Sequence, residues 1–401
     1  MMPLQLFQGE TLPRFTNQPA RGTKNDNVIN DKYAAGDARI VTEQARYPLN
    51  SIPVMIASGS YDLRPDFQRR HRWNLAKKSR LIESFIMNVP IPPIFLYENK
   101  YSHYEVMDGL QRLTAIDDFY CDKYALEGLE EWSELNGRKY SHLPEQVRRG
   151  IDRRYLSSVV LLQETAKIES EAARLKQLVF ERLNSGGVKL EPQETRNAIY
   201  PGPLNDLCIR LARNQNLCIT WGIPETANGE NSGEISDELL ENESYRKMED
   251  VELVLRFFAY RQRIDTQKGA LKDYLDYFQK HGNAFSYELI NNYENFFEDT
   301  IELVQKVLGY SAFWLWRKRI SGWAWYARPT TVLYDPIMFV FSQNLHNKAE
   351  LLEKSEDIKN ALPDFYEKNY QYFEGRNTNL SNIVKRNELL TEFIRRFVKK
   401  S

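Results

Sequence analysis

"YEVMDGLQRLTAI" (Tyr104–Ile116) is the stretch that decides the fold of this chain. Its first residues are apolar or β-branched and indicate a strand. After Gly109, apolar side chains recur three or four positions apart, as they do in a helix. The strand would therefore end at Asp108 and the helix would begin directly after the glycine. So short a turn directs the free amides of the first helical turn toward one point.

The Asp-Gly turn has two interpretations. In the first, Asp108 caps the helix, Gly109 serves the turn, and the Gln111 and Arg112 side chains lie in solvent. In the second, the turn binds a nucleotide phosphate. The glycine then lets the anion approach the backbone, and Arg112 offers two parallel hydrogen bonds. Gln111 would position a phosphate oxygen or a water, and Asp108 would hold a metal ion or a water. The pattern by itself leaves both open.

The composition of the chain is that of a globular protein. It has 401 residues, of which 42% are hydrophobic and 27% are charged. The net charge is -1, so a site for a polyanion would have to be a local patch. The three cysteines show no C-x-x-C spacing, and no apolar run approaches the roughly 20 residues that span a bilayer. The N-terminus also lacks a secretory apolar segment. We expect a cytoplasmic protein with no membrane partner.

Around the Asp-Gly turn, the pattern predicts alternating helices and strands. Asn74 is suited to cap a helix that runs to Val89, and proline stops that helix. Two strands, Ile94–Tyr97 and Tyr104–Met107, follow. Further helices are predicted near Asn50–Ala57, Pro144–Arg154, Ile168–Leu183 and Glu191–Tyr200, and further strands near Tyr61–Leu63 and Leu156–Glu164. Residues 1–45 lack periodicity and are predicted to be a mobile arm. Residues 201–401 read as helical, with little strand signal.

Five motifs together resemble a known family. They are "FQRRHRW", "SRLIESFIMNVPIPPIFLYE", "YEVMDGLQRLTAI", "FERLNSGGVKLEPQETRNAIY" and "EDVELVLRFF". Their order and spacing are similar to those of the GmrSD restriction endonuclease N-terminal domain family. That family is known for a D-G-Q-Q-R motif and belongs to the ParB/sulfiredoxin-like superfamily. The resemblance covers roughly residues 45–265. It implies an α+β fold with a ParB-like nucleotide-binding domain, which we place over residues 46–200. The sequence pattern itself predicts a mostly helical domain over 201–401.

The resemblance also implies roles for the turn. The motif binds and hydrolyses a nucleoside triphosphate, GTP or ATP, with Mg²⁺. Asp108, Gln111 and Arg112 would be catalytic, Asp108 would also be the metal ligand, and Gly109 would bind nucleotide. Leu110 replaces the first glutamine of the motif. If that glutamine positions the attacking water, turnover here would be slow; if it only packs, little would change.

Two other segments are candidates for nucleotide contacts. Gln68 and Arg69 would extend the phosphate site, or they would belong to a solvated loop. In one interpretation, the "NSGG" turn forms an anion-binding nest and the helix after it touches the nucleotide. In the other, the glycines only cap the preceding helix, and Glu194 and Arg196 form an ion pair on the surface of the next helix. The nucleotide-binding candidates in this second segment are Asn184, Gly186, Gly187, Arg196 and Asn197.

"FWLWRKRISGWAWYARP" (Phe313–Pro329) mixes aromatic and basic side chains. Such a segment can stack bases and hold phosphates. The commoner outcome, which we favour, is an aromatic core with the cations outside or in cation–π contacts.

Three functions remain open. The first is nucleoside triphosphate hydrolysis coupled to DNA restriction or anti-phage defence, and a defence-system protein could be a further partner. The second is a nucleotide-switched module that binds DNA or a partner without hydrolysis. The third is metal-dependent DNA nicking by the N-terminal domain. None of the five histidines has the surroundings of a His-Asn-His nuclease, so we expect no second nuclease domain of that type.

Overall fold

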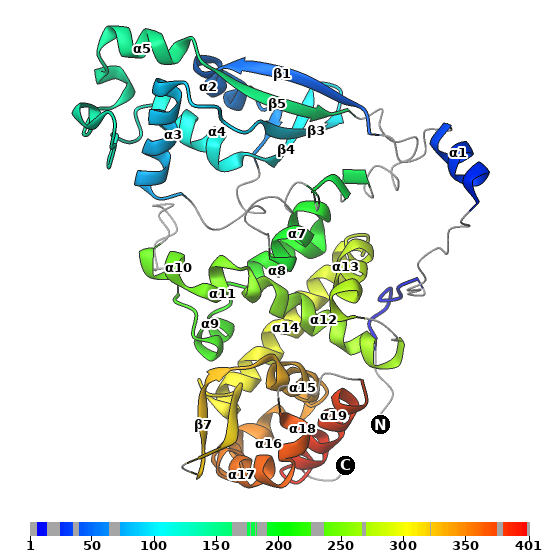
Figure 1. The fold of residues 1–401 in the computed structure, drawn as a ribbon. Helices are drawn as coiled ribbons and strands as arrows, with labels where there is room; N and C mark the ends of the chain where they lie inside the picture. Colours follow the sequence, from blue (N-terminus) through cyan, green and yellow to red (C-terminus); the bar gives the residue numbers. More distant parts are fainter. Residues whose placement is uncertain are drawn as a thin grey trace. The chain divides into compact units, whose positions relative to one another are not determined.

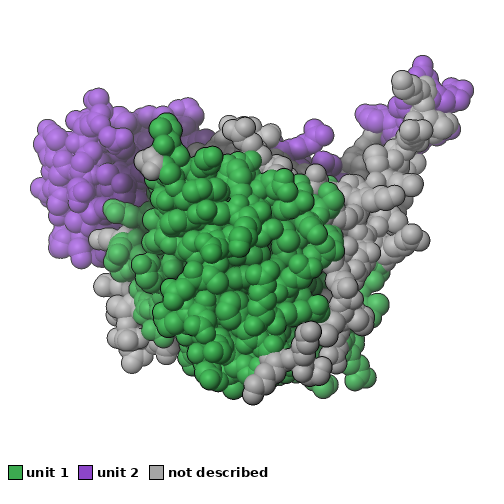
Figure 2. All heavy atoms as spheres, turned by 90° about the horizontal axis from the view of Figure 1, so that it is seen from below, with its two compact units in different colours: residues 1–19, 200–401 green, residues 20–199 purple. Residues whose placement is uncertain are grey.

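The computed structural model describes residues 6–13, 25–34, 40–63, 73–162, 175–176, 178–180, 182, 191–225, 236–266, 270–320, 322–374 and 380–398. The chain divides into two compact units, which Figure 2 colours separately. One unit comprises residues 20–199 and is called the sheet unit below. The other comprises residues 1–19 with 200–401 and is called the helical unit. One boundary between the two units lies between Ile199 and Tyr200.

The sheet unit is built on a mixed five-stranded sheet with the order β1-β5-β3-β4-β2 (Figure 1). The strands are β1 (Thr42–Pro48), β2 (Tyr61–Asp62), β3 (Ile94–Lys100), β4 (His103–Asp108) and β5 (Tyr155–Leu161). β1 with β5 and β3 with β4 are antiparallel, whereas β3 with β5 and β2 with β4 are parallel. A mixed sheet with separate helices confirms the predicted α+β class.

Helices complete the sheet unit. They are α1 (Asp26–Ala34), α2 (Ile52–Ala57), α3 (Leu75–Met87), α4 (Leu110–Tyr120), α5 (Glu145–Asp152) and α7 (Pro192–Ile199). The Asn74 side chain accepts a hydrogen bond from the amide of Lys77 at 3.0 Å, so α3 has the predicted cap. Helix α3 ends at Met87 and is followed by the C-cap Asn88, whose backbone is left-handed. Apolar faces of α3 and α4 join the sheet in one buried core, which includes Ile82 and Ile116.

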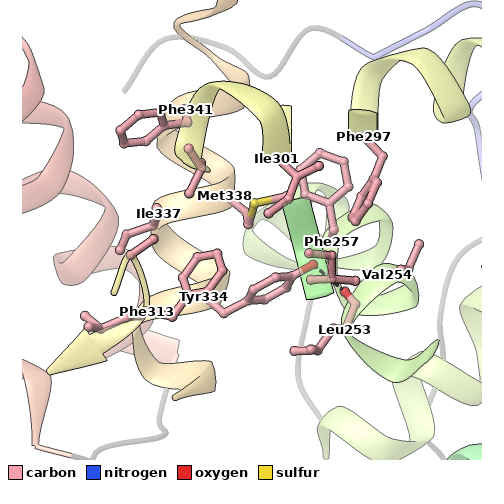
Figure 3. Close-up of a cluster of buried hydrophobic side chains, with 14 of the residues drawn as sticks. Leu253, Val254, Phe257, Phe297, Ile301, Phe313, Tyr334, Ile337, Met338 and Phe341 are labelled. Atoms are coloured by element: carbon pink, nitrogen blue, oxygen red, sulfur yellow. Dashed lines mark hydrogen bonds between the residues drawn. The ribbon is translucent and has the colours of Figure 1, made fainter. Parts of the chain in front are cut away.

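The helical unit has its own core. Its helices are α8 (Pro203–Leu211), α9 (Gln215–Trp221), α10 (Asp237–Glu241), α11 (Glu243–Arg246), α12 (Glu249–Thr266), α13 (Leu271–Gly282), α14 (Tyr287–Leu308), α15 (Thr331–Ser342), α16 (Lys348–Glu353), α17 (Ser355–Lys368), α18 (Tyr370–Phe373) and α19 (Leu380–Ile394). Figure 3 shows side chains of α12, α14 and α15 packed together. The buried Tyr334 hydroxyl donates to the carbonyl oxygen of Leu253 at 3.0 Å. No helix among the described residues is both long and apolar enough to cross a membrane.

Two features of the fold differ from what the sequence suggested. The helical unit contains a two-stranded hairpin, β6 (Trp314–Arg319) and β7 (Gly322–Pro329), in a half where little strand signal was found. Part of the predicted mobile arm is also packed. Glu10 is fully buried, and its two carboxylate oxygens accept from Arg261 Nη1 at 3.1 and 3.3 Å. The partner lies 251 positions along the chain, so local periodicity gives no sign of this contact.

Candidate functional site

The strand before the predicted phosphate site contains an irregularity. Phe95 pairs with Asp108, but its neighbour Leu96 pairs with Val106, so Met107 is an extra residue in β4. Such a bulge changes the direction of the side chain that follows it. Val106 and Met107 are both buried, whereas the Asp108 side chain is 45% exposed. The bulge therefore allows the strand to end on an accessible carboxylate.

Gly109 makes the turn possible. Its φ of +99° lies in the left-handed region, which residues with a Cβ rarely adopt. A Cβ at this position would also come within 2.3 Å of Ile94 Cγ2 and 2.9 Å of Ile94 Cβ. Helix α4 begins at the next residue, and no side chain caps its N-terminus in the described part of the structure. Asp108 is therefore not the helix cap that the first interpretation of the sequence required.

The carboxylate of Asp108 is held by Arg112 instead. Arg112 Nη2 donates to Asp108 Oδ2 at 2.5 Å, across one turn of α4. Its Nη1 donates to the carbonyl oxygens of Pro92 and Pro93, just before β3. The Arg112 side chain is only 12% exposed. Burial lowers the pKa of Arg112, and the adjacent Asp108 carboxylate acts in the opposite direction. The guanidinium thus joins the turn to the start of β3.

The neighbouring motif residues face different surroundings. Gln111 Oε1 accepts a hydrogen bond from the backbone amide of Trp73 at 3.1 Å. It therefore fixes the chain where the arginine-rich segment ends, rather than lying free in solvent. Leu110 is 7% exposed and belongs to the core of the sheet unit. In this structure, position 110 faces the core and does not present a side chain to the accessible carboxylate.

Of the remaining candidates, the structure describes only Arg196 and Asn197. Gln68, Arg69, Asn184, Gly186 and Gly187 lie outside the described residues. Arg196 and Asn197 lie on α7, where both are buried. Each is hydrogen-bonded to Gln193, at 2.8 Å in both cases. Asp108 makes no described contact with α7. The alternative that α7 carries a surface pair is wrong, because Glu194 and Arg196 are 7% and 2% exposed.

Comparison with known proteins places this site in a family. Residues 54–201 match the model of the GmrSD restriction endonuclease N-terminal domain. The chain carries a GmrSD N-terminal domain. No curated protein and no solved structure matches it significantly, so the ParB-like part of the fold prediction stays a prediction. The match indicates a role in DNA restriction or defence, with DNA as the interacting polymer.

The match spans the accessible end of β4 and the first turn of α4 in this GmrSD domain. Among the described residues, no group of three or more His, Cys, Asp or Glu side chains could hold a metal ion by itself. Within the described residues, a site for Mg²⁺ here would rest on Asp108, with phosphate and water oxygens as further ligands. This composition suits Mg²⁺, which is usually held by one or two carboxylates with phosphates and waters.

One polar contact of the GmrSD domain was not predicted. Glu105 lies three residues before Asp108, and both of its carboxylate oxygens accept hydrogen bonds from Lys176 Nζ at 2.7 Å. The two side chains are 16% and 10% exposed, and the ammonium also lies 5.5 Å from the centre of the Tyr97 ring. A run of β-branched and aromatic residues around Glu105 gave no sign that this acid would be paired within the fold.

Proposed function

We propose that the β4–α4 turn binds a nucleoside triphosphate and hydrolyses it, in the service of DNA restriction or phage defence. One observation supports this most strongly. The half-exposed Asp108 carboxylate stands beside the N-terminus of α4, which no side chain caps in the described part of the structure. Uncapped amides and the helix dipole favour a phosphate at this point.

The negative charge of Asp108 fits this role when a cation accompanies the nucleotide. A carboxylate alone would repel a triphosphate at the same helix end. Mg²⁺, when bound, would be held by Asp108 and would neutralise charge on the phosphates. Asp108 Oδ2 is engaged by Arg112, whereas Oδ1 has no hydrogen-bond partner in the described part of the chain. The Oδ1 atom is therefore the one we assign to the metal ion or to a water.

Arg112 acts in this proposal as a positioning residue. Its guanidinium already donates to Asp108 and to two proline carbonyls, and the side chain is mostly buried. The two parallel hydrogen bonds to phosphate that the sequence suggested would require some of these bonds to break. Gln111 is likewise a positioning residue, because it holds Trp73 at the end of the segment that carries Gln68 and Arg69.

Leu110 is compatible with turnover. The family motif has glutamine at this position, and the loss of that amide would matter if the side chain pointed at the reacting phosphate. Here the residue at 110 is buried in the core. We therefore expect the change to leucine to leave the hydrolysis rate largely unchanged, since it replaces a group that packs.

Phosphate release by the purified chain tests the proposal. Asp108→Asn keeps an acceptor for Arg112 but removes the charge, so phosphate release should fall by tenfold or more, on the order of one lost charge-assisted contact. Glu130→Gln is the matched control, because Glu130 is an exposed acid of the same unit, 74% exposed and paired with Arg80. Equal activity of wild type and Asp108→Asn would remove this turn from the mechanism.

A second function has one observation in its favour. The internal hydrogen bonds of Arg112 leave the described turn without a cation directed at the ligand. Such a site could bind a nucleotide as a switch without hydrolysing it. Calorimetry that detects nucleotide binding to the wild type, together with no phosphate release, would select this function over the first.

A further inference from the structure

The β6–β7 hairpin is the centre of a long basic segment in the helical unit. No aspartate or glutamate occurs between Glu302 and Asp335, whereas the same interval holds Lys306, Arg317, Lys318, Arg319 and Arg328. The whole chain has a net charge of only -1, so this imbalance is local. A local excess of positive charge is what a chain of nearly zero net charge needs to bind a polyanion.

The aromatic residues at the base of the hairpin pack against the rest of the helical unit. Leu315 is 5% exposed, and Trp316 and Trp325 pack against the core of the unit. Trp316 Nε1 donates to Glu367 of α17 at 2.9 Å, and the Trp325 ring contacts Tyr366 of the same helix. The expectation of an aromatic core with cations outside is therefore confirmed for this segment. In Figure 1 the strand β7 lies at the edge of the unit, near α17.

The distal part of the hairpin is different. Arg317, Lys318, Arg319 and Ile320 are all exposed. Cross-strand pairing of Leu315 with Tyr326 and of Arg317 with Ala324 puts Arg317 on the face of Tyr326. The Arg317 guanidinium lies 5.3 Å from the centre of that ring. A cation held over an aromatic ring at an exposed edge offers a charge and a flat apolar surface together.

These cations also lack acidic partners. Within the described residues, none of Arg317, Lys318 and Arg319 has a carboxylate within ion-pair distance. Other cations of the same unit are ion-paired, as Lys306 is with Glu302 at 2.5 Å and Lys359 with Glu356 at 2.9 Å. Unpaired cations on a protruding edge carry a repulsion that a phosphate backbone would remove.

The tip adds an apolar group between the charges. Ile320 directly follows Arg319 in the turn, and its relative exposure of 111% means that it makes almost no contact with the rest of the unit. Packing therefore gives no reason for isoleucine at this position. Groove-binding proteins combine cations on phosphates with apolar side chains inserted between base steps, and a two-stranded ribbon fits a DNA groove.

We propose that the distal half of the β6–β7 hairpin binds duplex DNA, with Arg317, Lys318 and Arg319 on phosphates and Ile320 entering a groove. Arg328 is also exposed, but it helps Lys247 to lower the pKa of Glu243, so its charge is partly offset. The inference rests on the proposed function only in taking DNA as the polymer. It assigns DNA binding to the helical unit and nucleotide chemistry to the sheet unit.

The salt dependence of DNA binding by the full chain tests the proposal. The probe is a fluorescent DNA duplex of mixed sequence, titrated at several salt concentrations. Each phosphate contact contributes about -0.9 to the slope of log K against log salt. The triple variant R317A/K318A/R319A should therefore lose about 2 to 3 units of slope and bind at least roughly tenfold more weakly near 0.1 M salt. Ile320→Ser, which adds no charge, should weaken binding with little change of slope.

The matched control is K306A/K354A/K359A, which removes the same charge from lysines that are ion-paired in the same unit. Its slope should equal that of the wild type. Equal slopes for the hairpin triple and the wild type would overturn the proposal, as would equal losses in both triples or tighter binding to duplex RNA. Nucleotide-dependent phosphate release without DNA separates the two proposals: the hairpin triple should retain it, and Asp108→Asn should lose it while keeping the wild-type slope.

Discussion

Replacing Gly109 by alanine should destabilise the sheet unit far more than an ordinary glycine substitution. Two effects add at this position. The left-handed backbone at φ +99° costs a residue with a Cβ about 1–2 kcal/mol. The new Cβ would also come within 2.3 Å of Ile94 Cγ2, and overpacking of this kind costs about 1–3 kcal/mol. We expect the free energy of unfolding to fall by about 2–5 kcal/mol.

Gly59 provides the matched control. It has a similar φ of +73° and lies in the same unit, but a Cβ there would meet nothing within 4 Å. Gly59→Ala should therefore cost only the backbone strain, about 1–2 kcal/mol. Urea denaturation of the full chain gives the two values. Since two units need not unfold together, amide hydrogen exchange in β3 and α4 identifies the transition that belongs to the sheet unit.

A second substitution tests the cause. Ile94→Ala removes the methyl group that would clash, and by itself should cost about 2–5 kcal/mol because Ile94 is fully buried. In the double variant, the 2.3 Å contact with Cγ2 is removed and only the 2.9 Å contact with the Cβ of residue 94 remains, so the combined loss should be smaller than the sum by about 1–3 kcal/mol. Strictly additive losses, or equal losses for Gly109→Ala and Gly59→Ala, would refute the argument that the turn is closed by contact with β3.

Three further predictions follow from single contacts. In Arg112→Lys, the lysine cannot hold Asp108 and the two proline carbonyls together. The free energy of unfolding should therefore fall by about 1–3 kcal/mol, and phosphate release should decrease. Unchanged values of both quantities would contradict the positioning role of Arg112. Glu10→Gln removes the carboxylate that faces the buried Arg261 guanidinium, so the free energy of unfolding should fall by about 3 kcal/mol in thermal denaturation. A change near zero, as expected for an exposed residue, would contradict the burial of this pair. Hydrogen bonds from two lysines lower the pKa of Glu302 to about 2. Because the folded pKa lies below the unfolded one, the stabilisation is present above about pH 4.5 and is lost as the pH falls toward 2. An NMR titration of the Glu302 carboxyl checks this, and a midpoint at the ordinary value would contradict it.

The elements around the Asp-Gly turn could be predicted because their signals are local. Asn74 caps α3 through its own first turn, and Gly109 joins β4 to α4 through its own backbone. Apolar positions three or four apart indicated α4, and the Leu113 and Ile116 side chains of that helix are buried as the period requires. The spacing of apolar residues along the chain is enough to predict a helix that is stabilised by burying one of its faces.

The parts that escaped prediction depend on contacts between distant residues. The carbonyls that bind Arg112 belong to Pro92 and Pro93, 20 and 19 positions away, and the partner of Glu10 is 251 positions away. The bulge at Met107 is a matter of register between β3 and β4 and not of composition. Buried polar residues on α7 also read as a surface helix, because a polar pattern does not reveal hydrogen bonds such as Arg196 to Gln193.

The same residues of the turn support both the fold and the proposed chemistry, and this decides which experiments are informative. Gly109 touches the core side chain Ile94, and Arg112 holds the backbone before β3, so loss of activity at either position is expected from unfolding alone. Asp108 differs, because nearly half of its side chain is exposed and its one described contact survives in asparagine. A loss of phosphate release in Asp108→Asn, with unchanged unfolding and unchanged hydrogen exchange in α4, is therefore the result that would separate a chemical role from a structural one.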